Sequence, residues 1–421
     1  MGKPTEMNRW LDPISRAYVR LSFHIDRLVP GFIDAYFGPP EWKIEVEDEA
    51  SVSLASLRRD AEALLREITP IPDELRREWL TKQVTAMIAT LRRLEGEKLP
   101  FDEELRLVYD IQPQWTDERG FEETLRAIDV LLPGEGSLSD RMEAWDKQFH
   151  VPKEKLLPLL TTCRDETRRR TRQIFALPEG EEIALQIVEK QPWAAYNWYL
   201  GNYRSRVDVN TDVPIRVNSM LEMMAHEGYP GHHTEHAIKE QCLYRQQGYA
   251  EACVQLINAP ESVISEGIAD LAWEIIFTEE ELEDWLRDEL YPLAGIQVDV
   301  SRDRALARAR RKLHPGGNAA FLLHRDGADE QTVVDYLMHY GANTEQYARQ
   351  YYRFISDPLF RSYVFNYFYG RELIDHFISA RSPKASDRIE RFRLLLENPL
   401  TPSRIQHWID NPIFSHNTGF L

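Results

Sequence analysis

Apolar residues repeat at helical spacing over most of this 421-residue chain, and this periodicity is the strongest limit on its fold. Between positions 51 and 95, apolar residues recur every three or four positions on both sides of the break TPIPDE. Two antiparallel helices are expected there, because a proline-containing break ends one helix before another begins. Similar patterns predict helices over 121–132, 139–149, 153–175, 260–278, 279–288, 293–313, 330–339 and 344–354. The chain is therefore predicted to be mainly α-helical.

One segment has a different period. Positions 182–188 and 205–211 alternate in the manner of short strands, and they flank the Trp/Tyr-rich sequence QPWAAYNWYLGNY. A small β-sheet is expected here, with an edge strand through 205–212 (SRVDVNTD) that could hold an extended peptide by strand addition. We expect an N-terminal helical region over residues 1–150 and a larger region over residues 151–421, packed together as one compact unit.

Composition limits the partners of the chain. Its 69 acidic and 51 basic residues give a formal charge of −18, which argues against binding to nucleic acid or to an anionic membrane surface. The first residues, MGKPTEMNRWLDP, lack the features of a signal peptide, and no apolar stretch approaches the about 20 residues that cross a bilayer. Three scattered cysteines (Cys163, Cys242 and Cys253) do not form a disulfide framework. We expect a cytoplasmic protein with free thiols.

The sequence HEGYPGHH, at positions 226–233, is an interrupted form of a metal-binding motif. In HExxH, two histidines one helical turn apart hold zinc, and the glutamate activates water. Here Pro230 takes the place of the second histidine, and an uninterrupted helix would put neither His232 nor His233 beside His226. Proline and glycine can end the helix, so that a two-residue bulge returns His232 to the missing position. His233 stays an alternative metal ligand.

A catalytic zinc ion needs a third protein ligand and an open position. The best candidate is Glu266, in the helical stretch SVISEGIADLAWE that follows the motif. Asp270, one turn later, is expected to accept the ring N–H of a liganding histidine and fix its tautomer. Another interpretation is a two-metal site, which would use His232, His233 and His236.

HEGYPGHH followed by SEGIADLAWE resembles the bacterial DUF885 proteins, distant relatives of the thermolysin-like (gluzincin-type) zinc peptidases. Their pattern is HExxPGH followed later by an S-E-G segment, and every named position is present here. The resemblance implies a zincin-like catalytic region within residues 151–421. It implies one zinc ion per chain, held by His226, His232 and Glu266. It also implies that Glu227 is the general base.

The C-terminal part matches this family less well. Near the C terminus the family has a tyrosine followed by Lys-Ile-Gly, whereas this chain has Tyr367 followed by Phe-Tyr-Gly. A hydrogen-bond donor is needed for the oxyanion of a hydrolytic reaction. Candidates in RSYVFNYFYGRELI are Tyr363, Tyr367 and Tyr369, with Tyr367 ahead because it falls on the family's tyrosine. Arg361 or Arg371 could hold a substrate carboxylate.

These residues favour a zinc-dependent metallopeptidase that hydrolyses short peptides by means of an activated water. An esterase or amidase with the same mechanism would have the same motif. The alternative is a catalytically silent helical binding or scaffold protein that retains the metal site. The intact Glu227 argues against this alternative, because that residue is not needed to hold a metal.

Overall fold

The computed structural model describes residues 12–191, 193–212, 214–380 and 384–411. Residues 1–11, which supported the prediction about targeting, lie outside this part. Among the described residues, no helix is both long enough and apolar enough to cross a membrane. Cys163, Cys242 and Cys253 are free thiols, as predicted.

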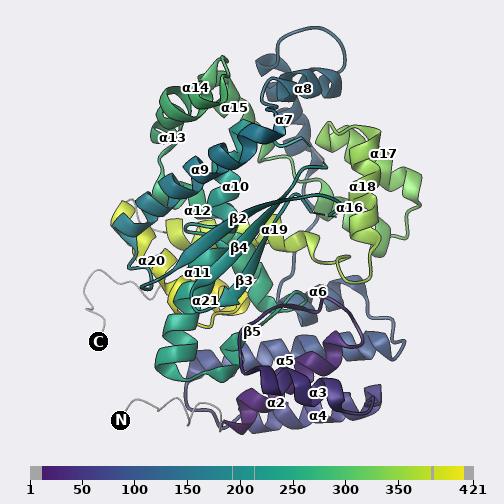
Figure 1. The fold of residues 1–421 in the computed structure, drawn as a ribbon. Coiled ribbons are helices and arrows are strands. Elements are labelled where there is room, and N and C mark those ends of the chain that lie inside the picture. Colours follow the sequence, from purple (N-terminus) through teal and green to yellow (C-terminus); the bar gives the residue numbers. More distant parts are fainter. Residues whose placement is uncertain (1–11, 192, 213, 381–383, 412–421) are drawn as a thin grey trace.

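The protein is mainly helical, as the periodicity predicted (Figure 1). The first elements are α2 (Pro13–Asp26), β1 (Ile33–Tyr36), α3 (Pro40–Asp48), α4 (Leu54–Ile68), α5 (Glu74–Leu94), α6 (Phe101–Tyr109), α7 (Glu118–Leu131) and α8 (Leu138–Lys147). The middle of the chain forms α9 (Lys153–Ile174), β2 (Glu182–Val188), β3 (Ala195–Gly201), β4 (Arg204–Asn210), α10 (Val217–Glu227), α11 (His232–Lys239), a π-helical stretch (Glu240–Gln247), a 3₁₀ turn (Ala250–Cys253), β5 (Val254–Leu256) and α12 (Pro260–Ile276).

The remaining elements are α13 (Glu279–Trp285), a π-helical turn (Leu286–Leu290), α14 (Tyr291–Ala294), α15 (Val300–Arg310), α16 (Gly316–His324), α17 (Glu330–Gly341), α18 (Glu345–Ser356), α19 (Val364–Ser379), α20 (Ala385–Glu397) and α21 (Pro402–Asp410). The expected antiparallel pair is confirmed as α4 and α5, whose N-termini are capped by Ser53 and Asp73. The single helix predicted over 293–313 is wrong. Gly295 ends α14 in the left-handed conformation, and Asp299 caps the start of α15.

The predicted small sheet is confirmed, but its strand order differs from the expectation. The order is β2-β4-β3, with β2 parallel and β3 antiparallel to β4. The edge strand expected through 205–212 is wrong, because β4 is the central strand and bonds a neighbour on each side. The Trp/Tyr-rich segment forms β3 and lies at the edge instead. Alternation identifies a strand but not its place in the sheet, because a central strand and an edge strand show the same two-residue period.

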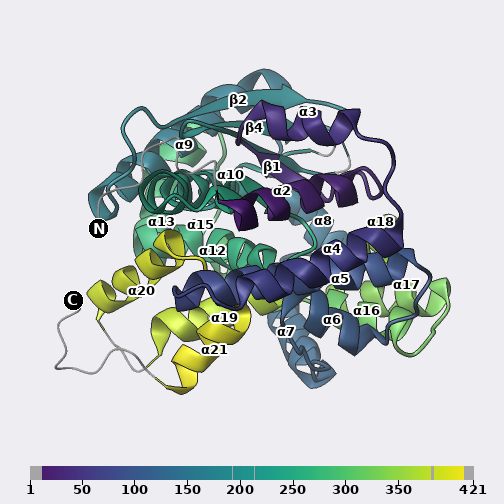
Figure 2. The ribbon, with the colours of Figure 1, turned by 90° about the horizontal axis from the view of Figure 1, so that it is seen from below.

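The elements that carry the motif residues are stacked in layers. Figure 2 shows the sheet uppermost, then α10, then α12, and α19 below it. Because it lies in the middle of this stack, α12 contributes to three separate hydrophobic clusters, through Val263, Ile268 and Trp273. A side chain on α12 is therefore held in place from several directions.

Gly267 on α12 and Gly370 on α19 allow these two helices to touch at their backbones. A Cβ atom at Gly267 would lie 2.5 Å from the carbonyl oxygen of Gly370, so no other residue fits without a shift. This contact brings the tyrosines at the start of α19 against α12. The predicted division near residue 150 stays a prediction, although one cluster combines Phe101 of α6 with Phe365 of α19.

Candidate metal centre

The interrupted motif forms a helix, a four-residue break and a second helix. The first helix, α10, ends at Glu227, and α11 begins at His232. Within the break, the backbone N–H of Gly231 donates to the carbonyl of Ala225 (2.9 Å), and a Cβ atom at Gly231 would overlap that carbonyl oxygen and the one of His226. Only glycine permits so tight a return of the chain. As a result, the rings of His226 and His232 lie 4.8 Å apart and perpendicular to each other.

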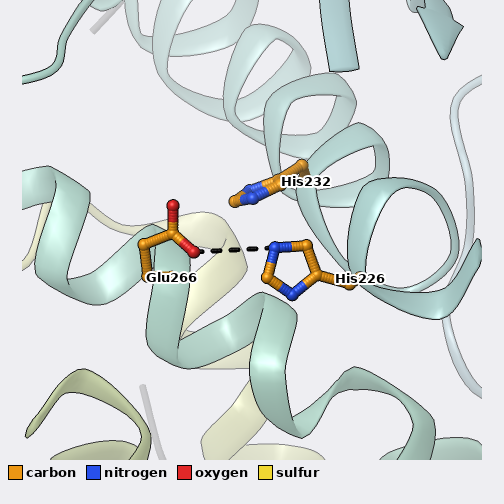
Figure 3. A group of neighbouring side chains, drawn as sticks. All are labelled: His226, His232 and Glu266. Atoms are coloured by element: carbon orange, nitrogen blue, oxygen red, sulfur yellow. Dashed lines mark ion pairs between the residues drawn. The ribbon is translucent and has the colours of Figure 1, made fainter. Parts of the chain in front are cut away.

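Glu266 of α12 completes a group of three side chains. One potential ligand atom from each of His226, His232 and Glu266 lies within 4.8 Å of the other two. Nε2 of His226 is 3.5 Å from Oε2 of Glu266. Figure 3 shows the carboxylate and the two imidazoles facing a common space. Two imidazole nitrogens and one carboxylate are a donor set typical of catalytic zinc sites.

Asp270 holds His226 in the orientation that this group requires. Its Oδ1 lies 3.1 Å from Nδ1 of His226, one turn along α12 from Glu266. Burial alone would lower the pKa of His226, but the hydrogen bond and charge of Asp270, with the charges of Glu227 and Glu266, raise it to about 10. Without a metal the ring is therefore protonated at both nitrogens, with Nδ1 directed at Asp270 and Nε2 at Glu266.

His232 is held by a separate chain of hydrogen bonds. Its Nδ1 lies 3.1 Å from Oγ of Ser265, and the Ser265 hydroxyl donates to Oε2 of Glu235 at 2.6 Å. Glu235 also accepts from Nζ of Lys239 at 2.6 Å. Because the single hydroxyl proton of Ser265 goes to Glu235, its oxygen accepts from Nδ1–H of His232. Nε2 of His232 is then unprotonated, which is the form that ligates a metal.

Glu266 has one oxygen bonded and one oxygen free. The hydroxyl of Tyr363 donates to its Oε1 at 2.6 Å, whereas its Oε2 is buried and has no hydrogen-bond partner among the described residues. Burial raises the pKa of this carboxyl, which is 6% exposed, to about 8. Its 3.5 Å pairing with Nε2 of His226 is not a hydrogen bond, and a buried carboxylate oxygen without a hydrogen bond is costly. A cation between Oε2 and the two histidines would remove that cost, so the residues present fit a metal ion.

Glu227 lies at the edge of this group, as the last residue of α10. Its side chain is 9% exposed, and burial raises its pKa, as does the charge of Asp34. The side-chain amide of Asn197, on β3, donates to its backbone carbonyl. The side chain of Glu227 is thus largely desolvated, and the backbone of this residue is bonded to the sheet.

Sequence reasoning missed Asp34, Tyr196 and Asn197 near this site. The Tyr196 hydroxyl donates to Asp34, and Tyr196 is electrostatically coupled to Glu227 and Glu266. The unusual Trp/Tyr-rich segment was a signal for the two β3 residues. Asp34 gave no signal, because it belongs to a strand of four residues far from the motif.

The alternative metal ligand, His233, is directed elsewhere. Its Nδ1 lies 2.8 Å from Oγ of Ser205, and its Nε2 lies 3.3 Å from Oε2 of Glu181. Nδ1 of His236 is within 2.6 Å of the side-chain amide of Gln255. Within the described ranges, the two-metal interpretation lacks its ligand group, since only His226, His232 and Glu266 gather closely enough.

The C-terminal candidates are divided between bonded and free groups. Arg361 pairs with the buried Glu104 (3.2 Å), and Arg371 bonds the backbone of Asp270 and the side chain of Glu274, so both arginines already have partners. Tyr363 is bonded to Glu266. Tyr367 is 38% exposed and has no hydrogen-bond partner in the described part of the chain. Partial desolvation and the charges of Glu266 and Asp270 raise the pKa of Tyr367 above its usual value, so its hydroxyl stays a donor.

Comparison with known proteins yields similarities of structure only. No family model and no curated protein matches the chain. A crystal structure of a protein named as a lipoprotein from Colwellia psychrerythraea aligns at a TM-score of 0.52 and 14% identity, over 88% of this chain and 70% of that one.

Two further solved structures align at lower TM-scores. A lipoprotein of unknown function from Shewanella oneidensis gives a TM-score of 0.48 at 13% identity, over 88% of this chain and 76% of that one. An M32 carboxypeptidase from Deinococcus radiodurans R1 gives 0.37 at 11% identity, over 94% and 93% of the two chains. The Colwellia psychrerythraea protein therefore shares the overall fold, and the function has to be argued from the site itself.

Proposed function

We propose that this chain is a zinc-dependent hydrolase of peptide bonds, with one zinc ion held by His226, His232 and Glu266. The observation that carries the proposal is the buried Oε2 of Glu266, which has no hydrogen-bond partner among the described residues and lies 3.5 Å from Nε2 of His226. It faces two histidines whose other ring nitrogens are already bonded. When bound, zinc would supply a Lewis acid that lowers the pKa of water and polarises a carbonyl group.

The protein's own residues supply the proton transfers and the orientation. Glu227 follows the first ligand directly in sequence, and its raised pKa suits a general base that takes a proton from water and later gives it to the leaving amine. The Tyr367 side chain is 38% exposed and its hydroxyl has no hydrogen-bond partner in the described part of the chain, so it is available to donate to the oxyanion. Asp270 and the Ser265–Glu235 pair hold the imidazoles.

The surroundings favour a peptide as the substrate. β3 lies at the edge of its sheet, and its Asn197 is bonded to the backbone of Glu227, so this strand runs beside the proposed base. An extended peptide that adds to a strand edge is held by main-chain hydrogen bonds. Its scissile bond would then be presented to Glu227.

The first test is zinc content per chain, measured by plasma emission in four alanine variants. We expect one zinc in the wild type, loss of zinc in His226→Ala, His232→Ala and Glu266→Ala, and full content in His233→Ala. The last variant is the matched control, because that histidine bonds Ser205 and Glu181 instead.

The second test concerns catalysis. Glu227→Gln should keep the zinc and lower kcat for peptide hydrolysis by about 100-fold to 10,000-fold. Glu222→Gln, on the same helix but bonded to Arg304 and Arg311, is the control and should stay active. If the zinc-loaded wild type hydrolyses no peptide, the peptidase proposal is wrong and the binding or scaffold alternative gains support.

A further inference from the structure

A groove with an excess of positive charge lies between α12, α15, α19 and α20. Its volume is about 650 Å³, and Trp273, Ile276 and Phe277 form part of its apolar lining. Its basic residues are Arg308, Arg311, Lys312, Arg371 and Arg388. The chain as a whole has a formal charge of −18, so cations gathered in one groove oppose the overall charge of the molecule. Such a groove concentrates anions locally.

The arginines on the α15 side outnumber the carboxylates that face them. Glu279 pairs with Arg304 (2.7 Å), with Arg308 (2.9 Å) and with Arg311 (3.7 Å). Glu222 also pairs with Arg304 and Arg311, but not with Arg308. Two carboxylates are thus shared by three guanidinium groups. The side chain of Arg308, which is 47% exposed, is left with part of its charge free for a further anion.

Lys312 and Arg388 have no acidic partner among the described residues. Glu281, which also lines the groove, pairs with Arg170 instead (3.4 Å). Lys312 is exposed, whereas Nε of Arg388 is buried and has no hydrogen-bond partner in the described part of the chain. A buried guanidinium N–H without an acceptor is costly, and an anion in the groove would supply the acceptor.

The groove adjoins the proposed metal centre. Arg371 lines the groove, is neutralised by Glu274 (2.5 Å) and donates to the backbone carbonyl of Asp270 at 2.7 Å. Oδ1 of Asp270 in turn lies 3.1 Å from Nδ1 of His226. Glu274 follows Asp270 by one turn of α12, and Arg371 follows Tyr367 by one turn of α19, so each pair shares a helix face. The same faces of both helices therefore lead from the metal group into the groove.

We propose that this groove binds acidic side chains of the substrate, through Lys312, Arg388 and Arg308. The inference rests on the proposed function and specifies its substrate class, which is peptides with glutamate or aspartate on one side of the bond that is cut. Cations on two helices that line one groove suit several carboxylates better than the single carboxylate of a C-terminus. Glu274 lies two turns of α12, or about 12 Å, from Glu266, and an extended peptide advances about 3.3 Å per residue. The acidic residues would therefore be three or more positions from the scissile bond.

The test measures binding without turnover, by calorimetry on the zinc-loaded Glu227→Gln protein at about 0.15 M salt, which screens the distant negative charges. Acetylated and amidated octapeptides carry four alanines and four glutamates, in both orders. Each is compared with the peptide in which glutamine replaces glutamate. We expect one glutamate order to bind about 3-fold to 30-fold more tightly than its glutamine match, which is what two or three partly exposed charge pairs supply. That order identifies the side of the scissile bond that the groove receives.

The double variant Lys312→Gln/Arg388→Gln should abolish this preference and leave the Kd of the glutamine peptides within about twofold. The control Arg302→Gln/Lys147→Gln removes two positive charges from exposed positions outside the groove and should keep the preference. Glutamate that bound the zinc ion itself would keep its advantage in the first double variant, and that result would overturn the inference. So would equal Kd values for glutamate and glutamine peptides, or no binding of any peptide. A preference shown only by octa-alanine with a free C-terminal carboxylate, against its amide, would also overturn it.

The outcome is separable from the proposed function. A preference for glutamate that the first double variant abolishes, in a protein whose zinc-loaded wild type hydrolyses nothing, would leave the groove standing and reject the peptidase. Hydrolysis by the wild type without any such preference would reject only the role of the groove.

Discussion

The hydrogen-bond chain behind His232 makes a quantitative prediction about metal affinity. In Ser265→Ala, Nδ1–H of His232 loses its acceptor and Glu235, which is 1% exposed, loses a donor. Partners that orient a liganding histidine typically contribute about 10-fold to 100-fold in metal affinity. The dissociation constant for zinc should therefore rise by that factor, which corresponds to about 1.4–2.8 kcal/mol.

Stability should fall in the same variant by a separate amount. Burial would raise the pKa of Glu235, but the charge of Lys239 and the hydrogen bond from Ser265 keep it below its usual value, so the carboxylate is charged. A buried charged acceptor that loses one hydrogen bond costs about 1.5–3 kcal/mol. Urea unfolding of the zinc-free protein measures this loss independently of the metal.

Zinc affinity is best measured by competition with a chromophoric chelator. Ser262→Ala is the matched control, because Ser262 is a buried serine of the same helix that bonds Asn366 and the carbonyl of Ala259, away from the ligands. It should lose stability and keep its zinc affinity. The reasoning is refuted if Ser265→Ala binds zinc as tightly as the wild type, or if both variants lose affinity equally.

Three further perturbations test the packing, the protonation and the tyrosines. Gly267→Ala should destabilise the fold by about 1–3 kcal/mol, since its methyl group meets the backbone of α19. The control Gly120→Ala, in open space on α7, should stabilise the fold slightly. Equal melting temperatures of the two variants would contradict this reasoning. In the metal-free protein the pKa of His226 is about 10, above its usual value, so zinc must displace a proton at neutral pH. The pKa of Glu266 is about 8 in that state, so zinc also displaces the proton of this carboxyl. Zinc affinity should then rise by about tenfold to 100-fold per pH unit between pH 6.5 and 7.5 in the chelator assay, and a flat profile would show that zinc displaces no proton. Tyr367→Phe should lower kcat and leave zinc affinity unchanged, because Tyr367 is partly exposed beside the site. Tyr363→Phe should weaken zinc binding, because its hydroxyl bonds the ligand Glu266. Kinetics and competition titrations that show the reverse pattern would exchange the two roles.

Local patterns gave most of the helices and the types of site residue. Periodicity depends on neighbours three or four positions away, so α4, α5 and α12 were recognisable without any tertiary information. The same holds for the break in the motif, because Pro230 and its glycines act on their own backbone. A predicted helix over 293–313 failed where the chain turns at Gly295, since apolar spacing continues across the turn.

Other features depended on contacts between distant segments. The position of β4 inside its sheet follows from pairing with β2 and β3, and alternation is the same in a central and an edge strand. Arg371 was a candidate for holding a substrate carboxylate until the structure showed it bonded to α12. Its charge was readable in the sequence, but its partner was not.

By itself, therefore, the sequence determined a helical chain, a motif that cannot continue as one helix, and the histidine and carboxylate residues that are candidates for binding a metal. Only the tertiary structure decided that His232 faces His226 while its neighbour His233 faces Glu181. It alone decided that a bulge in β1 places Asp34 where the hydroxyl of Tyr196 on β3 donates to it. The physical reason is that adjacent residues of a helix point in directions about 100° apart, and which direction meets a metal, a carboxylate or solvent is set by the layers packed around that helix.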